Sequence, residues 1–187
     1  MTSSSFNCMP GLPILHSKDL VNWQIIAHAL QRFPSDEFNK PQLGKGVWAP
    51  TIRYHNGEFY IYFPEPDLGI YLVKAKNPEG PWSEPLLVKS AKGWIDPCPF
   101  WDEDGKAYLV HAFAGSRAGL KSVLAINRMS EDGTKLLDEG VIVFDGHEKH
   151  PTIEGPKLYK KNEYYYIFTP AGGVPKGWQT VLRSKNI

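Results

Sequence analysis

Ile95-Asp96-Pro97, followed after a polar turn by Gly105-Lys106-Ala107-Tyr108-Leu109-Val110, is the stretch that decides the fold. It joins an acidic residue and a proline to a short strand, a turn and an aromatic strand. The same plan occurs at Trp48-Ala49-Pro50 with Gly57-Glu58-Phe59-Tyr60-Ile61-Tyr62, and at Ile153-Glu154-Gly155-Pro156 with Glu163-Tyr164-Tyr165-Tyr166-Ile167. Four strands in each unit, repeated at a spacing of roughly 50 residues, are typical of the blades of a β-propeller.

Strand-like runs cover the rest of the chain and are separated by polar turns such as His55-Asn56-Gly57. The predicted strands are residues 12–16, 23–30, 50–54, 58–63, 70–75, 83–89, 107–113, 122–128, 141–144, 157–159, 164–169 and 179–183. No segment reads as a long amphipathic helix, so we predict an all-β fold. The aromatic runs 58–63, 107–113 and 164–169 are expected to be second strands of their blades, buried on both sides.

The repeat predicts about three and a half blades, so we expect residues 1–187 to be a partial β-propeller domain of a longer protein. Residues 2–6 fall where the second strand of blade one belongs, so its innermost strand would precede Met1. Blades two and three are expected to be complete. Blade four is expected to be incomplete, because residues 183–187 end inside the turn that leads to its fourth strand. The alternative is a small β-protein that closes on itself.

The composition argues against several classes of protein. The 21 Lys and Arg residues are balanced by 20 Asp and Glu, and the net charge of +1 argues against a nucleic-acid or membrane-surface partner. No apolar run reaches the roughly 18 residues of a membrane span, and no signal peptide is visible at the start. Cys8 and Cys98 are too few for a disulfide scaffold or a cysteine-based zinc site. We expect two free, buried thiols; a bonded pair is the alternative.

Two carboxyl groups occupy equivalent places in the repeat. The first strand of each propeller blade lines the central channel, so residues at the starts of these strands converge, and those positions hold Ala49, Asp96 and Glu154. Glycoside hydrolysis needs such a pair: one carboxyl group protonates the leaving oxygen, and another activates water or attacks carbon. Burial and a nearby like charge would keep a proton on one of them near neutral pH. The alternative is that both residues only cap turns.

Several motifs together resemble glycoside hydrolase family 43. They are residues 1–6 (MTSSSF), residues 10–23 (PGLPILHSKDLVNW), Gly46-Val47-Trp48-Ala49-Pro50, Ile95-Asp96-Pro97 and Ile153-Glu154-Gly155-Pro156. The resemblance implies a five-bladed β-propeller and an enzyme that hydrolyses the O-glycosyl bonds of xylosides or α-L-arabinofuranosides with inversion. It also implies substrates such as xylan, arabinoxylan and arabinan, no required cofactor, and export from the cell. By the same resemblance Glu154 is the general acid, and Asp96 tunes the pKa of that acid and orients the substrate.

The resemblance also indicates what the chain lacks. The family's general base is an aspartate in an Asp-Pro sequence on the innermost strand of blade one, and the remaining Asp-Pro here, Asp96-Pro97, is already assigned. We therefore expect the chain to be inactive alone and its complete parent to be active. The fifth blade, which in many members supplies a histidine beside a central calcium or water, has no counterpart. A structural calcium would belong to the complete propeller, and no metal site is predicted from the spacing of the histidines in this chain.

Four further residues are candidate substrate contacts. Trp48 and Phe6 match aromatic walls of the family's sugar subsite. Arg117 lies in the Gly-rich loop 114–119, where its forked donors could hold hydroxyl groups. Trp178, together with Gly172-Gly173, could form the rim of the pocket. For Trp48, Arg117 and Trp178 a structural role is the alternative: a blade-core tryptophan, a solvated loop arginine and a loop anchor.

Two other classes of function stay open. One is a carbohydrate-binding propeller without catalysis, which the missing base favours. The other is a protein-interaction scaffold, which has no reason to place Asp96 and Glu154 on the channel side of adjacent blades. Xylosidase and arabinofuranosidase both remain as alternatives, because the two sugars share most contacts.

Overall fold

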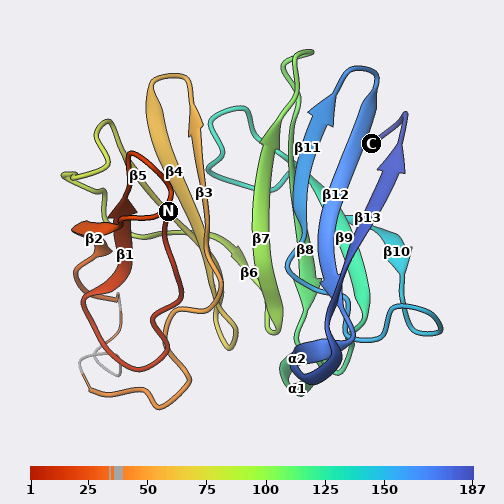
Figure 1. Ribbon diagram of the computed structural model, residues 1–187, viewed down its shortest axis with the longest axis horizontal. Coiled ribbons are helices and arrows are strands. Elements are labelled where there is room, and N and C mark those ends of the chain that lie inside the picture. Colours follow the sequence, from red (N-terminus) through yellow and green to blue (C-terminus); the bar gives the residue numbers. More distant parts are fainter. Residues whose placement is uncertain (34, 36–39) are drawn as a thin grey trace.

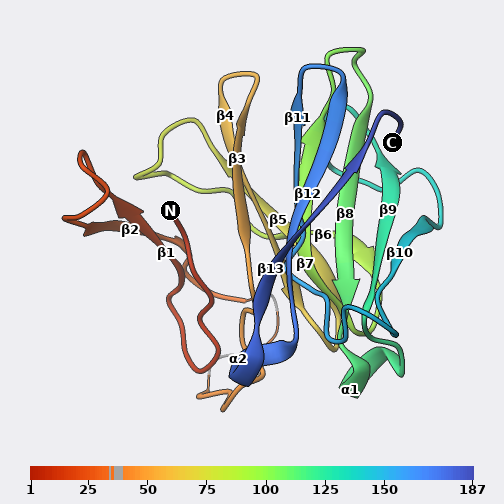
Figure 2. The ribbon, with the colours of Figure 1, turned by 45° about the vertical axis from the view of Figure 1, so that its right-hand side comes forward.

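The computed structural model describes residues 1–33, 35 and 40–187. Within these residues the chain forms thirteen strands in four antiparallel sheets and two helices of four residues each, so the predicted all-β fold is confirmed. The sheets follow one another around the molecule in chain order, from red to blue in Figures 1 and 2. None of the described helices is long and apolar enough to cross a membrane.

Each sheet is a meander in which strands that follow one another in the sequence also pair, and we call the sheets blades one to four in chain order. Blade one contains β1 (Gly11–His16) and β2 (Gln24–Leu30); blade two contains β3 (Thr51–His55), β4 (Glu58–Glu65), β5 (Gly69–Ala75) and β6 (Leu86–Ser90). Blade three contains β7 (Trp94–Trp101), β8 (Ala107–Phe113), β9 (Val123–Met129) and β10 (Val141–Asp145); blade four contains β11 (Lys157–Lys161), β12 (Tyr164–Ala171) and β13 (Trp178–Ser184). The helices α1 (Gly115–Ala118) and α2 (Gly173–Lys176) both lie at the lower end of the sheets in Figures 1 and 2.

The first strands of blades two, three and four lie beside one another, because β7 contacts both β3 and β11. This is the arrangement of the inner strands of a propeller, whose starts meet near a common axis. Residues 2–6, expected as the second strand of blade one, form isolated bridges through Thr2 to Ile14 and through Ser5 to Val47 rather than a continuous strand.

Three apolar layers hold neighbouring blades face to face. Leu12 and Leu30 of blade one pack in one cluster with Ile61 and Phe63 of blade two. The remaining layers join blades two and three through Tyr62, Leu72 and Leu109, among others, and blades three and four through Val110, Leu124, Leu158 and Ile167, among others. Burying apolar surface on both faces of a blade stabilises the fold by about 25 cal/mol per Å² removed from water.

The aromatic strands differ in how completely they are buried. β4 and β8 are buried over most of their length, as predicted for second strands. The prediction is wrong for β12, where Phe168 is 41% exposed. The face of blade four that carries Leu158 and Ile167 packs on blade three, whereas Tyr159 and Phe168 lie on the opposite face, which the described residues do not cover.

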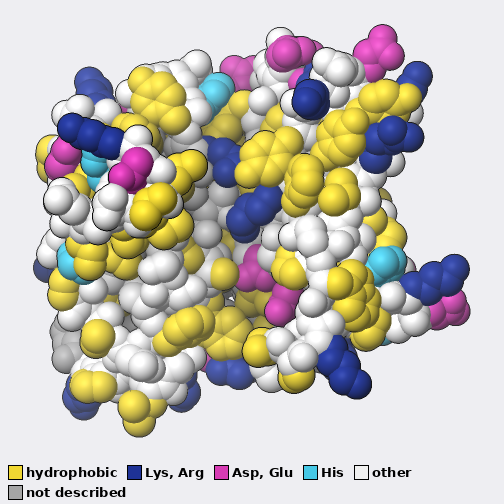
Figure 3. Space-filling model, viewed as in Figure 1, with side chains coloured by type: hydrophobic (Ala, Val, Ile, Leu, Met, Phe, Trp, Pro, Cys, Tyr) yellow, Lys and Arg dark blue, Asp and Glu magenta, His cyan; other side chains and the backbone are white. Residues whose placement is uncertain are grey.

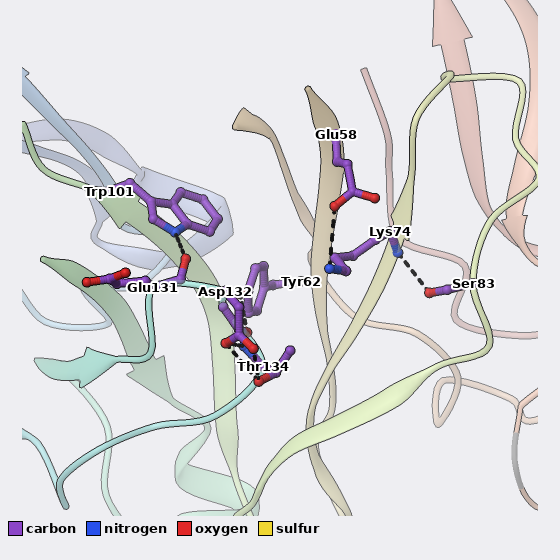
Figure 4. Close-up of polar contacts among 9 residues, drawn as sticks. Glu58, Tyr62, Lys74, Ser83, Trp101, Glu131, Asp132 and Thr134 are labelled. Carbon is purple, nitrogen blue, oxygen red and sulfur yellow. Dashed lines mark hydrogen bonds and ion pairs between the residues drawn. The ribbon is translucent and has the colours of Figure 1, made fainter. Parts of the chain in front are cut away.

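Polar contacts bind blades two and three at the end of β9 (Figure 4). The Tyr62 hydroxyl donates to the Gly133 carbonyl at 2.5 Å, and Trp101 Nε1 donates to the Glu131 carbonyl at 2.8 Å. The loop after β9 is therefore tied both to blade two and to the inner strand of its own blade. In blade two, Lys74 lies 3.5 Å from Glu58 and binds Ser83 through its backbone N–H.

One strand agrees with the repeat, and one thiol departs from the sequence predictions. β7 is the short strand that the repeat predicts at Asp96-Pro97, although no predicted strand range covers it; it pairs with β8 alone, and such an edge strand tolerates proline. Both cysteines are free, as expected. Cys98 is buried but Cys8 is exposed, since it lies in the loop before β1, so the expectation of two buried thiols is wrong for Cys8.

Candidate active site

Asp96 and Glu154 meet where the inner strands of blades three and four begin. The Gly155 N–H donates to Asp96 Oδ2 at 2.7 Å, so the residue after Glu154 directly contacts Asp96. The backbone of Glu154 is fixed to β12, because its N–H donates to the Pro170 carbonyl at 3.1 Å and its carbonyl accepts from Thr169 Oγ1 at 2.5 Å. The predicted proximity of the two carboxyl residues is therefore found in the structure.

An irregularity in β7 sets the position of Asp96. The pairing register with β8 shifts between Ile95 and Cys98, and Asp96 has a φ of 57°. Aspartate tolerates the left-handed region better than most residues, and a bulge of this kind turns a side chain out of the regular pleat. The sequence Asp96-Pro97 thus builds a local bend that leaves the carboxylate beside blade four.

Gly155 is required for this contact. Its φ is 61°, and a Cβ atom built on it would lie 3.2 Å from Pro170 Cδ. A larger residue would strain the backbone and push against the proline ring. Glycine therefore permits the close approach of a backbone N–H to Asp96.

Burial and like charge favour a protonated Glu154. Asp96 is only 7% exposed, and burial raises its pKa, against the opposing effects of the Gly155 N–H and the Lys157 charge. Glu154 is half-buried, and burial together with the negative charge of Asp96 raises its pKa. A carboxylic acid whose pKa is raised keeps a proton that it can donate, as a general acid must.

Trp48, Phe6 and Arg117 gather at one place, and Trp48 ties them to the apolar layer behind the inner strands. Trp48 packs against the apolar cluster that contains Ile95 and Ile153, the residues immediately before Asp96 and Glu154. Its Nε1 donates to the Gly44 carbonyl at 2.9 Å, and the Phe6 ring stands edge-on to it at 6.0 Å between centroids. The two aromatic rings form a fixed wall, and Phe6 is 44% exposed.

Arg117 has protein partners rather than a free guanidinium. It lies in α1, 5.6 Å above the centre of the Trp48 ring, and its Nε lies 3.3 Å from Asp67 of the turn after β4. A guanidinium over a tryptophan face is attracted by the ring's negative π-cloud. Arg117 therefore holds Trp48 in place and is not the solvated arginine of the alternative interpretation.

Trp178 lies apart from this wall. It opens β13 opposite Ala171, and its ring packs so closely on Gly172 that a Cβ atom there would lie 2.3 Å from it. His150 is its described ring neighbour, 6.3 Å away between centroids, and Trp178 is 42% exposed. These contacts match the loop-anchor alternative, while the exposed edge leaves a contact at the rim a prediction.

Two cationic side chains that the sequence analysis did not single out, Arg53 and Lys157, also lie on the inner strands near the propeller axis. Arg53 Nη2 donates to Cys98 Sγ at 3.1 Å, and its guanidinium lies 4.9 Å from the centre of the Tyr159 ring. Lys157 faces Asp96, Cys98 and Arg53. Figure 3 shows acidic and basic side chains close together in the hollow between the two halves of the molecule. Strand alternation from Gly155 to Lys157 is the signal that could have placed this lysine on the axis.

This part of the axis does not fit a structural calcium. Calcium takes six to eight oxygen ligands, which can be carboxylates, carbonyl groups and waters. In the described part of the chain no group of three or more His, Cys, Asp or Glu side chains could hold a metal ion. The guanidinium of Arg53 and the ammonium of Lys157 would repel a divalent cation at the centre of these blades.

A separate apolar cavity of about 580 Å³ opens between blades three and four, away from the carboxyl groups. Ile126, Phe144, Leu158 and Leu182 are among the residues that line it, and neither Asp96 nor Glu154 does. Arg183 and Tyr165 also line it, but none of its described lining residues is an Asp, Glu or His, so the candidate site remains the one at the propeller axis.

The whole chain matches one protein family. Residues 1–187 match the sequence profile of the family described as glycosyl hydrolases family 43. The chain belongs to this family. The predicted resemblance is confirmed, and with it the five-bladed propeller class, of which the described sheets form a part.

Relatives and solved structures agree with the family. A Xylanibacter ruminicola protein, provisionally named as a beta-xylosidase, is 47% identical over 189 residues, which are 100% of this chain and 34% of the relative. A beta-xylosidase of Bacillus subtilis is 36% identical over 98% of this chain and 36% of its own length. The crystal structure of a xylan beta-1,4-xylosidase from Bacillus halodurans superposes with a TM-score of 0.82 at 32% identity, covering 100% of this chain and 37% of that one. The chain thus spans about a third of the length of these relatives.

Proposed function

We propose that this chain supplies the acid half of the active site of an inverting glycoside hydrolase that acts on xylose- or arabinose-containing glycans. The observation that carries the proposal is the contact of Asp96 with the Gly155 N–H at 2.7 Å, which joins two carboxyl residues at the starts of adjacent inner strands. The names of the relatives support the sugar class, since they include beta-xylosidases and a non-reducing end alpha-L-arabinofuranosidase of Bacteroides ovatus.

The roles follow from the electrostatics of the pair. Glu154 donates its proton to the glycosidic oxygen as the bond from that oxygen to the anomeric carbon breaks. Asp96 stays charged beside it, keeps the proton on Glu154 until that step, and is placed to accept a hydrogen bond from a sugar hydroxyl. The Trp48 and Phe6 rings offer apolar faces to the C–H face of a pentose. The proposed reaction uses water and carboxyl groups and needs no cofactor.

Inversion requires a second carboxylate that removes a proton from the attacking water on the opposite face of the sugar, roughly 6.5–9.5 Å from the acid. Asp96 accepts a hydrogen bond at 2.7 Å from Gly155, the residue directly after Glu154, and we assign it the tuning and orienting role rather than that of the base. We assign no general base among the described residues. General-base help is typically worth about 10²–10⁴ in rate, so we expect the 187-residue chain alone to turn over substrate very slowly.

The test compares the 187-residue chain with a longer protein that contains it and its flanking coding sequence. Both are assayed on aryl β-xyloside and aryl α-L-arabinofuranoside, and the anomer first released is identified by proton NMR. We expect turnover with inversion from the longer protein and little from the chain. Retention of configuration, or no hydrolysis of either substrate by the folded longer protein, contradicts the proposal; the second result favours a carbohydrate-binding propeller.

A further inference from the structure

A closed set of contacts surrounds the Trp48 side chain and spans blades two and three. Arg117 lies 5.6 Å above the centre of the Trp48 ring, and its Nε lies 3.3 Å from Asp67 Oδ1. The backbone N–H of Trp48 donates to the Pro64 carbonyl at 3.1 Å, so the tryptophan is also bonded to the end of β4, close to Asp67 in the sequence. The backbone and the ring of Trp48 are therefore both held from the same turn of blade two.

Hydrogen bonds fix the turn that carries Asp67. Glu65 is 2% exposed, and its Oε2 accepts from the backbone N–H groups of Asp67 at 2.9 Å and Leu68 at 2.7 Å. The turn is also bonded to the loop before β7, because the Gly93 N–H donates to the Pro66 carbonyl at 2.7 Å. With these N–H groups paired inside the protein, the turn has a defined conformation. Asp67 therefore presents its carboxylate from a fixed backbone.

The helix α1, which carries Arg117, is bonded to the same loop before β7. The Ala114 N–H donates to the Gly93 carbonyl at 2.8 Å, and a Cβ atom on Gly93 would lie 2.4 Å from the Ala118 backbone nitrogen. Glycine, here at a φ of 80°, permits this close approach. Asp67 and Arg117 thus come from two blades whose loops are joined through Gly93, and backbone contacts set the separation of the two side chains.

The position of the Arg117–Asp67 pair matters more than its contribution to stability. The two side chains are 24% and 39% exposed, and ion pairs at such a surface add little to stability. The pair instead holds a cation over the face of Trp48, while Trp48 Nε1 donates to the Gly44 carbonyl at 2.9 Å. A ring held at its face and at its nitrogen has one orientation. In Figure 1 α1 lies at the end of the sheets where the inner strands β3, β7 and β11 begin, which is the end of the candidate site.

We propose that Arg117, held by Asp67, is a positioning residue for sugar binding: it fixes the Trp48 ring as the wall of the subsite and does not itself contact the sugar. The inference rests on the proposed function for the identity of the sugar, whereas the clamp on the ring is a property of the folded chain. A ring that is already fixed binds without an ordering cost, so the clamp strengthens binding and leaves the chemical step alone. Its loss should raise KM and leave kcat nearly unchanged.

The first test is a double-mutant cycle in the longer protein, assayed on the aryl β-xyloside. Arg117→Gln should raise KM about three- to fivefold, the effect expected of losing a cation over a tryptophan face. In a Trp48→Ala background the same substitution should change KM no further, because it acts only through the ring. Arg117→Lys should raise KM less than Arg117→Gln, since an ammonium can still pair with Asp67 and lie over the ring.

The second test observes the ring in the 187-residue chain and needs no catalysis. The ¹⁵N heteronuclear NOE of the Trp48 indole N–H is measured by NMR in the wild type, Arg117→Gln and Asp67→Ala. The NOE should fall in both variants, because the ring loses its clamp and moves faster. The indole of Trp82, which donates to the Pro78 carbonyl, should keep its NOE in all three proteins.

Arg128→Gln is the matched control, since it breaks an ion pair of 3.0 Å with Asp138 at the end of β9 remote from α1, and should change neither KM nor the NOE. If Arg117→Gln does not fold, Asp67→Ala serves for both measurements. Additive effects of Arg117→Gln and Trp48→Ala on KM overturn the inference in favour of direct contact between Arg117 and the sugar. An unchanged KM or an unchanged NOE overturns it as well. Lack of hydrolysis by the wild-type longer protein would instead remove the proposed function and leave the NOE result standing.

Discussion

Acid should destabilise the blade that carries Asp96 through one buried histidine, His111. His111 lies on β8, is 1% exposed, and stacks on Trp94 at 3.8 Å between ring centroids. Its Nε2 lies 3.1 Å from Asn127 Oδ1, and Asn127 Nδ2 donates to the Asp138 carbonyl at 3.1 Å. The amide oxygen is therefore an acceptor, and a neutral ring satisfies it by donating from Nε2.

The cost of protonating this ring follows from its surroundings. Burial lowers the pKa of His111 from 6.5 to about 4. A difference of about 2.5 pKa units, at 1.36 kcal/mol for each, corresponds to about 3 kcal/mol. Because the pKa is lower in the folded state than in the unfolded state, this stability is fully present above pH 6.5 and is lost as the pH falls toward 4.

The assay is urea unfolding followed by tryptophan fluorescence at about pH 7.5 and about pH 4, for the wild type and His111→Gln. Glutamine has no proton to gain, so the wild type should lose about 3 kcal/mol more than the variant between the two pH values. Groups other than His111 cancel in this difference. His16→Gln, which changes an exposed histidine, should behave as the wild type. An equal loss in the wild type and His111→Gln would refute the reasoning.

Three further predictions concern the site and its support. Gly155→Ala should lower the free energy of unfolding by about 1–2 kcal/mol, because alanine at a φ of 61° is strained and its Cβ meets Pro170. Urea unfolding measures the change, and an unchanged free energy of unfolding would contradict the prediction. Glu65 is 2% exposed, and burial raises its pKa from 4.5 to about 6. Because its charged form is disfavoured in the folded state, Glu65→Gln should stabilise the chain by about 2 kcal/mol well above pH 6 and by little below pH 4.5. A stabilisation that does not change with pH would contradict this prediction. In the longer protein Trp48→Ala should raise KM for the aryl xyloside about tenfold and Trp178→Ala much less, since we propose that the Trp48 ring forms the wall of the sugar subsite, whereas Trp178 packs elsewhere; equal effects would place both at the same subsite.

Local sequence patterns were enough for most of the fold. Strand-like runs separated by polar turns predicted the described strands other than β7, and the repeat predicted β7 as the short strand at Asp96-Pro97. The edge position of β7 in the assembled sheet makes its two prolines acceptable.

The site was predictable where symmetry determines it. Equivalent places in the repeat brought Asp96 and Glu154 together, because inner strands of adjacent blades start at the same end of the axis. The partners of these groups come from tertiary contacts that no motif encodes. Arg117, for example, meets Asp67 of another blade.

The central claim, that Glu154 is the general acid, is tested most directly by how the kcat/KM of Glu154→Gln changes with the leaving group of the substrate. In the longer protein, the variant and the wild type are compared on phenyl β-xyloside, whose leaving oxygen needs a proton, and on 2,4-dinitrophenyl β-xyloside, whose leaving group does not. If Glu154 is the general acid, the variant should lose about 10²–10⁴ in kcat/KM on the phenyl substrate and far less on the dinitrophenyl substrate, while the exposed control Glu163→Gln loses nothing on either. An equal loss on both substrates would show that Glu154 does not donate the proton, and would contradict the assignment of the axial carboxyl pair.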